Sequence, residues 1–215
     1  MNILRSTLKI MADKVIVLLV EGPTEIEFYK AVVKYAHDKM GVLLGCSFEY
    51  KDMHGIGNYK KDALRKVKKI QQDNAASDIY VLMCIDTDVF ELSKKPPFDK
   101  KAVKIALEEA GVKQVHYIEA RQSIEDWFLT DLTGVLSYLR LPADTKRPKG
   151  KGQDILKSLF KKANKIYVKG GKTEGFIGKL DISKIITQHC ETIKPLCKIV
   201  KFDCQKICNK KRAGS

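Results

Sequence analysis

The feature that most limits how this chain can fold is an alternation of short apolar segments with longer amphipathic segments. The short segments have the length and apolar content of buried strands. We expect these strands at 14–20, 46–50, 79–85 and 114–118. The longer segments repeat apolar residues at helical spacing, and we expect helices at 24–39, 59–74, 99–110 and 124–139. Strands and helices in alternation predict an α/β fold, in which a mainly parallel sheet is flanked by helices on both faces.

The alternation stops near residue 140, and the segment that follows has a different character. Residues 142–152 combine Pro and Gly with the cations Lys146, Arg147, Lys149 and Lys151, which predicts an exposed basic loop. A helix is expected at about 153–163, then a strand or turn at 166–168, and then further helix. We therefore expect an α/β core over 1–140 and a mostly helical extension over 141–215, packed together as a single domain.

The charge of the chain points to a polyanionic partner. The sequence has 40 Lys and Arg against 26 Asp and Glu, a formal net charge of +14. A surplus of this size favours nucleic acid, either DNA or RNA, because neutralising phosphates releases counterions. Lys-rich surfaces also arise from compositional bias, so the charge alone does not decide the question.

No segment has the character of a membrane span, and we expect no membrane partner. The longest clean apolar run, 15–20, is far too short to cross a bilayer. The six cysteines include no Cys-x-x-Cys pair, so we expect reduced thiols in a cytoplasmic protein. A zinc cluster of His189 with the C-terminal cysteines is the alternative, although the spacings match no known zinc pattern.

Acidic residues follow three of the predicted strands at the point where each strand ends. Glu21 follows the first strand, and Asp86 and Asp88 follow the third. Ser123 and Glu125 come shortly after the fourth. Because parallel strands end at one edge of a sheet, these side chains are expected to converge. Converging carboxylates repel one another unless a cation binds, and hard oxygen ligands suit Mg²⁺ or Mn²⁺.

Each acidic position also has an ordinary structural explanation. Acidic residues are common in turns, and Gly22 could simply permit a tight turn. Glu25 and Glu27 lie where the dipole of a helix favours acidic side chains. Three clusters in register with three strands are harder to attribute to chance, since Asp86 and Asp88 follow the most apolar stretch of the chain.

Taken together, these motifs resemble the Toprim domain, in particular its OLD and RloB-like branch, which includes the Toprim effectors of anti-phage systems such as PARIS. The motifs that carry the resemblance are Glu21-Gly22-Pro23-Thr24-Glu25, Asp86-Thr87-Asp88, Ser123-Ile124-Glu125-Asp126-Trp127-Phe128 and Tyr167-Val168-Lys169. The resemblance spans roughly residues 14 to 180 and implies a Toprim-like α/β fold.

The resemblance also implies a function: a nuclease that hydrolyses phosphodiesters with two Mg²⁺ or Mn²⁺ ions, as an effector in phage defence. The implied metal ligands are Glu21, Glu25 and Asp86 around one ion, and Asp88, Ser123 and Glu125 around the other. Glu21, Asp86 and Asp88 would be catalytic, and a late lysine, Lys169 or Lys172, would stabilise negative charge in the transition state. The ATPase part of OLD proteins is absent from this sequence, so such a partner would be a separate subunit. A homodimer is a further expectation.

Two other functions stay open at this level. Asp86-x-Asp88 after an apolar strand also matches the nucleophile motif of haloacid-dehalogenase phosphatases. That motif normally follows the first strand, and a phosphatase would leave Glu21 and Glu125 without a role. The third possibility is a non-catalytic Toprim module that binds nucleic acid or a partner protein, although such modules commonly lose the acidic residues that this chain keeps.

Overall fold

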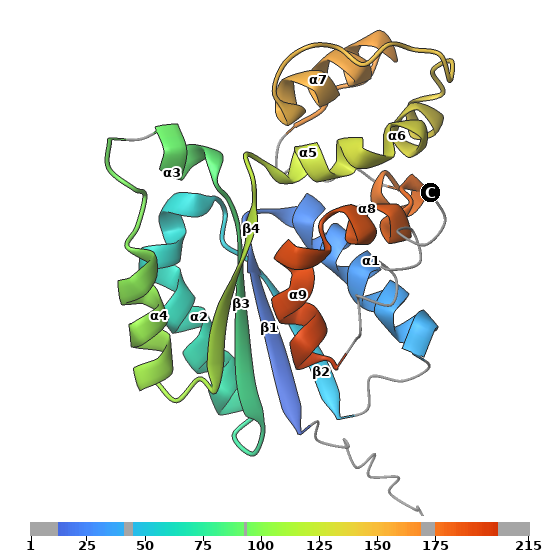
Figure 1. Cartoon of the computed structure of the whole chain (residues 1–215). Helices are drawn as coiled ribbons and strands as arrows, with labels where there is room; N and C mark the ends of the chain where they lie inside the picture. The colour runs from blue at the N-terminus through green and yellow to red at the C-terminus, as the bar shows by residue number, and fades with distance from the viewer. Residues whose placement is uncertain (1–12, 41–44, 93, 169–174, 202–215) are drawn as a thin grey trace, which may run out of the picture.

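The centre of the fold is a four-stranded sheet in which every strand runs parallel to its neighbours (Figure 1). The structure is a computed structural model and describes residues 13–40, 45–92, 94–168 and 175–201. The strand order is β2-β1-β3-β4. The strands are β1 (Lys14–Val20), β2 (Cys46–Asp52), β3 (Asp78–Asp86) and β4 (Gln114–Ala120). The predicted α/β class with a parallel sheet is confirmed.

Helices cover both faces of this sheet, and alternate residues of β1 face two separate cores. Val15, Val17 and Leu19 belong to the core beneath α2 (Tyr59–Asp73) and α4 (Lys100–Glu109). Ile16 and Leu18 belong to the core beneath α1 (Pro23–Met40) and the C-terminal helices. Both sets are fully buried, which explains why β1 reads as an unbroken apolar run rather than as an alternating one.

The helical elements flank the sheet in chain order. They are α1 (Pro23–Met40), η1 (Ile56–Asn58), α2 (Tyr59–Asp73), α3 (Asp88–Leu92), α4 (Lys100–Glu109), α5 (Ile124–Phe128), η2 (Leu129–Asp131), α6 (Leu132–Leu139), α7 (Gly152–Lys162), η3 (Ile177–Lys179), α8 (Ile182–Gln188) and α9 (Cys190–Ile199). In Figure 1, α2 and α4 lie on one face, α1 and α9 lie on the other, and α5 to α7 lie above the ends of the strands.

Several boundaries differ from those expected. The helix expected at 124–139 is interrupted at Asp131, whose backbone leaves the helical region because its carboxylate accepts hydrogen bonds from the Asp181 N–H (2.8 Å) and Lys184 Nζ (3.3 Å). The short helix α3 was not anticipated. The expected strand or turn at 166–168 has neither conformation.

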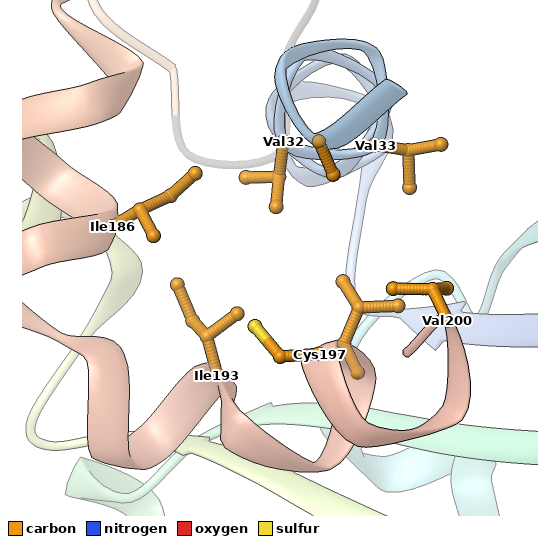
Figure 2. A pocket seen from close by; sticks show the side chains of 8 residues that line it. Val32, Val33, Ile186, Ile193, Cys197 and Val200 are labelled. Carbon is orange, nitrogen blue, oxygen red and sulfur yellow. The ribbon is translucent and has the colours of Figure 1, made fainter. Parts of the chain in front are cut away.

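The C-terminal helices pack on the same core as the sheet. Figure 2 shows Val32 and Val33 of α1 facing Ile186 of α8 and Ile193 and Cys197 of α9. The space left between these side chains is only about 10 Å³, room for little more than one water molecule. This seam is therefore packing between helices and not a ligand pocket. None of the helices in the described part of the chain is both long and apolar enough to cross a membrane.

Candidate functional site

The acidic residues singled out from the sequence lie at the C-terminal edge of the sheet. Glu21 follows β1, Asp86 ends β3, and Asp88 begins α3. Glu125 lies in α5, shortly after β4 ends. Because β1, β3 and β4 are adjacent in the sheet, segments far apart in the sequence meet here.

Two hydrogen bonds connect these segments directly. The backbone N–H of Asp86 donates to Glu21 Oε1 (2.9 Å), which ties the end of β1 to the end of β3. The backbone N–H of Ile124 donates to Asp86 Oδ1 (2.8 Å), which ties the end of β3 to α5. Asp86 is 1% exposed, so its carboxylate is buried between these elements. The acidic side chains thus also organise the backbone of the site.

Glu25 occupies the third position of α1, where its carboxylate accepts a hydrogen bond from the Gly22 N–H (2.6 Å). This contact is half of a capping box, and it gives Glu25 a structural role. Burial raises the pKa of Glu25 well above its ordinary value, and the negative charges of Asp86, Glu21 and Glu125 raise it further, against the lowering effect of the Gly22 hydrogen bond. The carboxylates are therefore close enough to destabilise one another's charge.

Two buried carboxylate oxygens at this edge receive no hydrogen bond. They are Asp88 Oδ1 and Glu125 Oε2, for which the described residues offer no donor. The other oxygen of Glu125 accepts from the Tyr167 hydroxyl at 3.0 Å. A buried acceptor without a partner costs about 1–3 kcal/mol, and an ion is one of the standard explanations for such an atom.

A cleft of about 720 Å³ opens at this edge, a size typical of ligand sites. Glu21, Glu25 and Glu125 line it together with Asp52, His54 and Tyr167, among others. Asp52 ends β2 at the same edge of the sheet, and its carboxylate accepts from the His54 N–H (2.6 Å) and lies 3.2 Å from His54 Nδ1. The backbone of His54 is left-handed (φ 54°), an uncommon conformation for a residue other than Gly.

Asp52 and His54 were not predicted as site residues from the sequence, and Tyr167 was noted only as part of the Tyr167-Val168-Lys169 motif, without a role of its own. Asp52 and His54 could have been found, because β2 is expected to end at the same edge as β1, and a carboxylate there follows the pattern of the other strands. The approach of Tyr167 to Glu125 could not have been found, because 42 residues without any regular spacing separate the two.

Some predicted site residues are not brought together. The Ser123 hydroxyl donates to Asp126 Oδ2 (3.0 Å), and Ser123 does not line the cleft. Lys169 and Lys172 lie outside the described residues, as do Cys204 and Cys208 of the zinc alternative. Within the described ranges, no group of three or more His, Cys, Asp or Glu side chains is arranged to hold a metal ion. The carboxylates share one edge of the sheet, but only Glu21, Glu25 and Glu125 line the cleft, whereas Asp86 and Asp88 do not. Among the described residues they therefore form no ready-made cage of ligands.

Comparisons of the chain with protein-family models, with curated proteins and with solved structures found no match. The resemblance to Toprim proteins therefore rests on the motifs in the sequence alone. The all-parallel α/β fold is consistent with a Toprim-like arrangement, and many other families share this class of fold.

Proposed function

We propose that this protein is a divalent-metal-dependent nuclease whose active site is the acidic cleft at the C-terminal edge of the sheet. The observation that carries the proposal is the pair of buried carboxylate oxygens without donors, Asp88 Oδ1 and Glu125 Oε2. They occur beside three further carboxylates in a chain whose formal net charge is +14. A strongly basic protein that gathers five carboxylates at one edge of its sheet fits a cation-binding site there.

The residues present fit Mg²⁺ or Mn²⁺, which prefer oxygen ligands. The candidate ligands are the acids of this edge: Glu21, Glu25, Asp86, Asp88 and Glu125. When bound, a pair of such ions activates a water molecule and stabilises the leaving oxygen of a phosphodiester. Ser123 fits less well, because its hydroxyl is engaged by Asp126.

The chain's own residues would do the remaining work. Tyr167 orients Glu125 through its hydroxyl, and backbone N–H groups hold Glu21 and Asp86. The Asp52 carboxylate, 3.2 Å from His54 Nδ1, orients the His54 ring at the rim of the cleft. By analogy with the Toprim motifs, Lys169 or Lys172 would stabilise the negative charge that develops on the phosphate.

The substrate class follows from charge, and the biological role follows from resemblance. The basic surface favours DNA or RNA as the substrate. A role as an effector in phage defence, together with a separate ATPase subunit or a homodimer, is proposed from the resemblance to OLD and RloB-like proteins alone.

The two alternative functions receive less support. A phosphatase of the haloacid-dehalogenase type would use Asp86 as its nucleophile, but this carboxylate is 1% exposed and accepts a hydrogen bond from Ile124. A binding module without catalytic activity would not explain why buried oxygens of Asp88 and Glu125 receive no hydrogen bond, since such atoms destabilise the fold.

The test compares Glu21→Gln with Glu27→Gln, which removes the same charge from a half-buried position in α1, outside the cleft lining. Cleavage of a panel of DNA and RNA substrates is measured with Mg²⁺, with Mn²⁺ and with chelator. Glu21→Gln should lower the rate at least about a hundredfold, the usual scale for a lost acid–base group, while Glu27→Gln should be nearly silent. Full activity of Glu21→Gln would remove this residue from the mechanism. Phosphatase activity without nucleic-acid cleavage would favour the dehalogenase-type alternative.

A further inference from the structure

A second cleft, of about 850 Å³, lies between the C-terminal ends of α6 and α7. Its cations and polar groups come from α6 and its end, from the end of α7 and from η3: Tyr138, Arg140, Lys162, Asn164, Lys165 and Lys179. Among the residues that the structure describes, no carboxylate lines it. We call it the lysine cleft.

The cations of the lysine cleft are not engaged by the protein's own acids. Arg140, Lys162, Lys165 and Lys179 are all exposed, and among the described residues none of them has a carboxylate within ion-pair distance. Many other cations of the surface do, such as Lys34 with Asp38 at 2.6 Å.

Part of this charge has a local explanation. The C-terminal ends of helices favour nearby cations, which accounts for Arg140 after α6 and Lys162 in the last turn of α7. Lys179 comes from η3, a separate segment, and Lys165 lies with its Nζ 4.5 Å from the centre of the Tyr138 ring. The two helix ends therefore explain Arg140 and Lys162, but they do not explain why Lys165 and Lys179 lie in the same cleft.

The loop between α6 and α7 extends this positive charge toward the acidic cleft. It begins at the lysine cleft, and its exposed cations Lys146, Arg147, Lys149 and Lys151 are opposed by one acid, Asp144. The loop ends where Gly152 packs against Asp126 at the start of α5, next to Glu125. The exposed cations from Arg140 to Lys151 thus begin at the lysine cleft and end beside α5, and we call them the basic track.

We propose that the lysine cleft and this track bind the sugar–phosphate backbone of nucleic acid, and hold it across the acidic cleft. The length of the track identifies an extended polyanion and not a single phosphate group. The helical run from 124 to 139 spans at most about 24 Å, at 1.5 Å per residue, which corresponds to roughly seven nucleotides of a duplex strand. This inference deepens the proposed function, since it takes nucleic acid as the ligand, but it concerns binding and not cleavage.

The test uses two variants that each remove three exposed lysines. The triple change Lys162→Gln, Lys165→Gln and Lys179→Gln alters the lysine cleft, and the matched control Lys60→Gln, Lys61→Gln and Lys68→Gln alters α2 on the opposite face of the sheet. Binding of a labelled 20-nucleotide RNA and a 20-base-pair DNA duplex is measured in chelator over a series of salt concentrations.

The cleft variant should bind at least about tenfold more weakly than the parent, and the slope of log affinity against log salt should fall by about two to three, at close to 0.9 per lost phosphate contact on duplex DNA. The control should change affinity by less than about twofold. Equal losses in both variants, or an unchanged slope in the cleft variant, would overturn the proposal. Binding to vesicles of anionic lipid in preference to either nucleic acid would assign the cleft to membranes and likewise overturn it.

Single variants and metal-free conditions separate binding from folding and from cleavage. If the triple variant melts at a lower temperature than the parent, Lys162→Gln and Lys179→Gln are measured singly, and each should lower the salt slope by about one. Because binding is measured without metal, its outcome is independent of cleavage. Normal binding by the cleft variant beside loss of cleavage in Glu21→Gln would overturn this inference and leave the proposed nuclease intact.

Discussion

At the scale of single residues, the interaction between Tyr167 and Glu125 is the contact on which the acidic cleft depends most. Burial raises the pKa of the Tyr167 hydroxyl, and the adjacent carboxylate of Glu125 raises it further, so this hydroxyl stays a donor at every accessible pH. It satisfies one oxygen of a side chain that is 1% exposed. The segment that carries Tyr167 is thereby fixed against α5.

Replacing Tyr167 by Phe keeps the ring and removes this donor. Both oxygens of Glu125 then lack a donor among the described residues, so the free energy of unfolding at pH 7 should fall by about 1–3 kcal/mol. Tyr35→Phe is the control, because its hydroxyl pairs with Ser183 Oγ in a half-buried position, and it should cost less, about 0.5–1.5 kcal/mol. Urea denaturation measures the free energy of unfolding of both variants. Equal losses would show that the hydrogen bond to Glu125 stabilises the fold no more than the hydrogen bond between Tyr35 and Ser183.

The residue scale also shows what the sequence can and cannot predict about the site. Glu21 and Asp86 were predictable, because each directly follows an apolar run and parallel strands end at one edge. The engagement of Ser123 by Asp126 and the approach of Tyr167 were not, since both depend on how α5 and the chain after α7 pack. Local sequence contains no periodic signal for contacts of that kind.

At the scale of elements, the strands were predictable to within two residues and the breaks in helices were not. β1 is fixed by its own apolar residues. The interruption at Asp131 is imposed by the start of α8, because the N–H of its N-cap residue Asp181 and Lys184 Nζ donate to the Asp131 carboxylate. Tertiary hydrogen bonds override helix propensity here, and only the packed chain reveals them.

The contact between α5 and α7 is closest at Gly152. A Cβ atom added there would lie 2.7 Å from the backbone N of Asp126, which cannot move without shifting α5. Gly152→Ala should therefore lower the free energy of unfolding by about 1–3 kcal/mol through overpacking, more than the helix propensity of Ala returns. Gly57→Ala is the control, since nothing lies within 4 Å of the added atom. A neutral or stabilising Gly152→Ala in urea denaturation would contradict this packing.

His189 joins three elements and should make stability depend on pH. It lies between α8 and α9, its ring stacks on Trp127 of α5 (centroids 4.6 Å apart), and Nε2 lies 3.0 Å from Thr130 Oγ1. Burial lowers the pKa of His189 from 6.5 to about 4, with Asp126 opposing the shift. The folded state thus favours the neutral ring.

The stability contributed by neutral His189 is fully present above pH 6.5 and should be lost as the pH falls from 6.5 toward 4. The full shift corresponds to about 3 kcal/mol, and because the ring is only half-buried we expect roughly 1–2 kcal/mol. Urea denaturation from pH 7.5 to 4.5 measures it, with His189→Gln as the comparison. The same acid-induced loss in both proteins would exclude His189 as the cause.

At the scale of the whole molecule, the acidic cleft is a local concentration of negative charge in a protein whose formal net charge is +14. Burial and the carboxylates of Asp86 and Glu21 raise the pKa of Glu25. A raised folded-state pKa means that the stability associated with protonated Glu25 is complete below about pH 4.5 and is lost as the pH rises through the folded value. Without metal, the fold therefore loses stability at this site toward neutral pH.

Bound divalent metal should restore the stability that repulsion between these carboxylates removes. The rise in melting temperature caused by Mg²⁺ relative to chelator should increase from pH 5 to pH 8, because metal binds the ionised form of Glu25 and the pKa of Glu25 is raised. At a metal concentration about 100 times the dissociation constant, the gain is about 2.7 kcal/mol. Glu21→Gln should reduce this gain while Glu27→Gln keeps it. A metal effect that is independent of pH, or unchanged in Glu21→Gln, would place the bound ion elsewhere.

The position of α9 has a consequence for how the protein is made. This helix covers β3 and β4, yet it begins at residue 190, 70 residues after β4 ends at residue 120. On the ribosome, the strands emerge long before the helix that shields them, so the nascent chain exposes one apolar face of its sheet for as long as the intervening segment takes to be translated. Translation at about 5–20 residues per second makes that interval several seconds. The growing chain therefore cannot complete its core until α9 has left the exit tunnel.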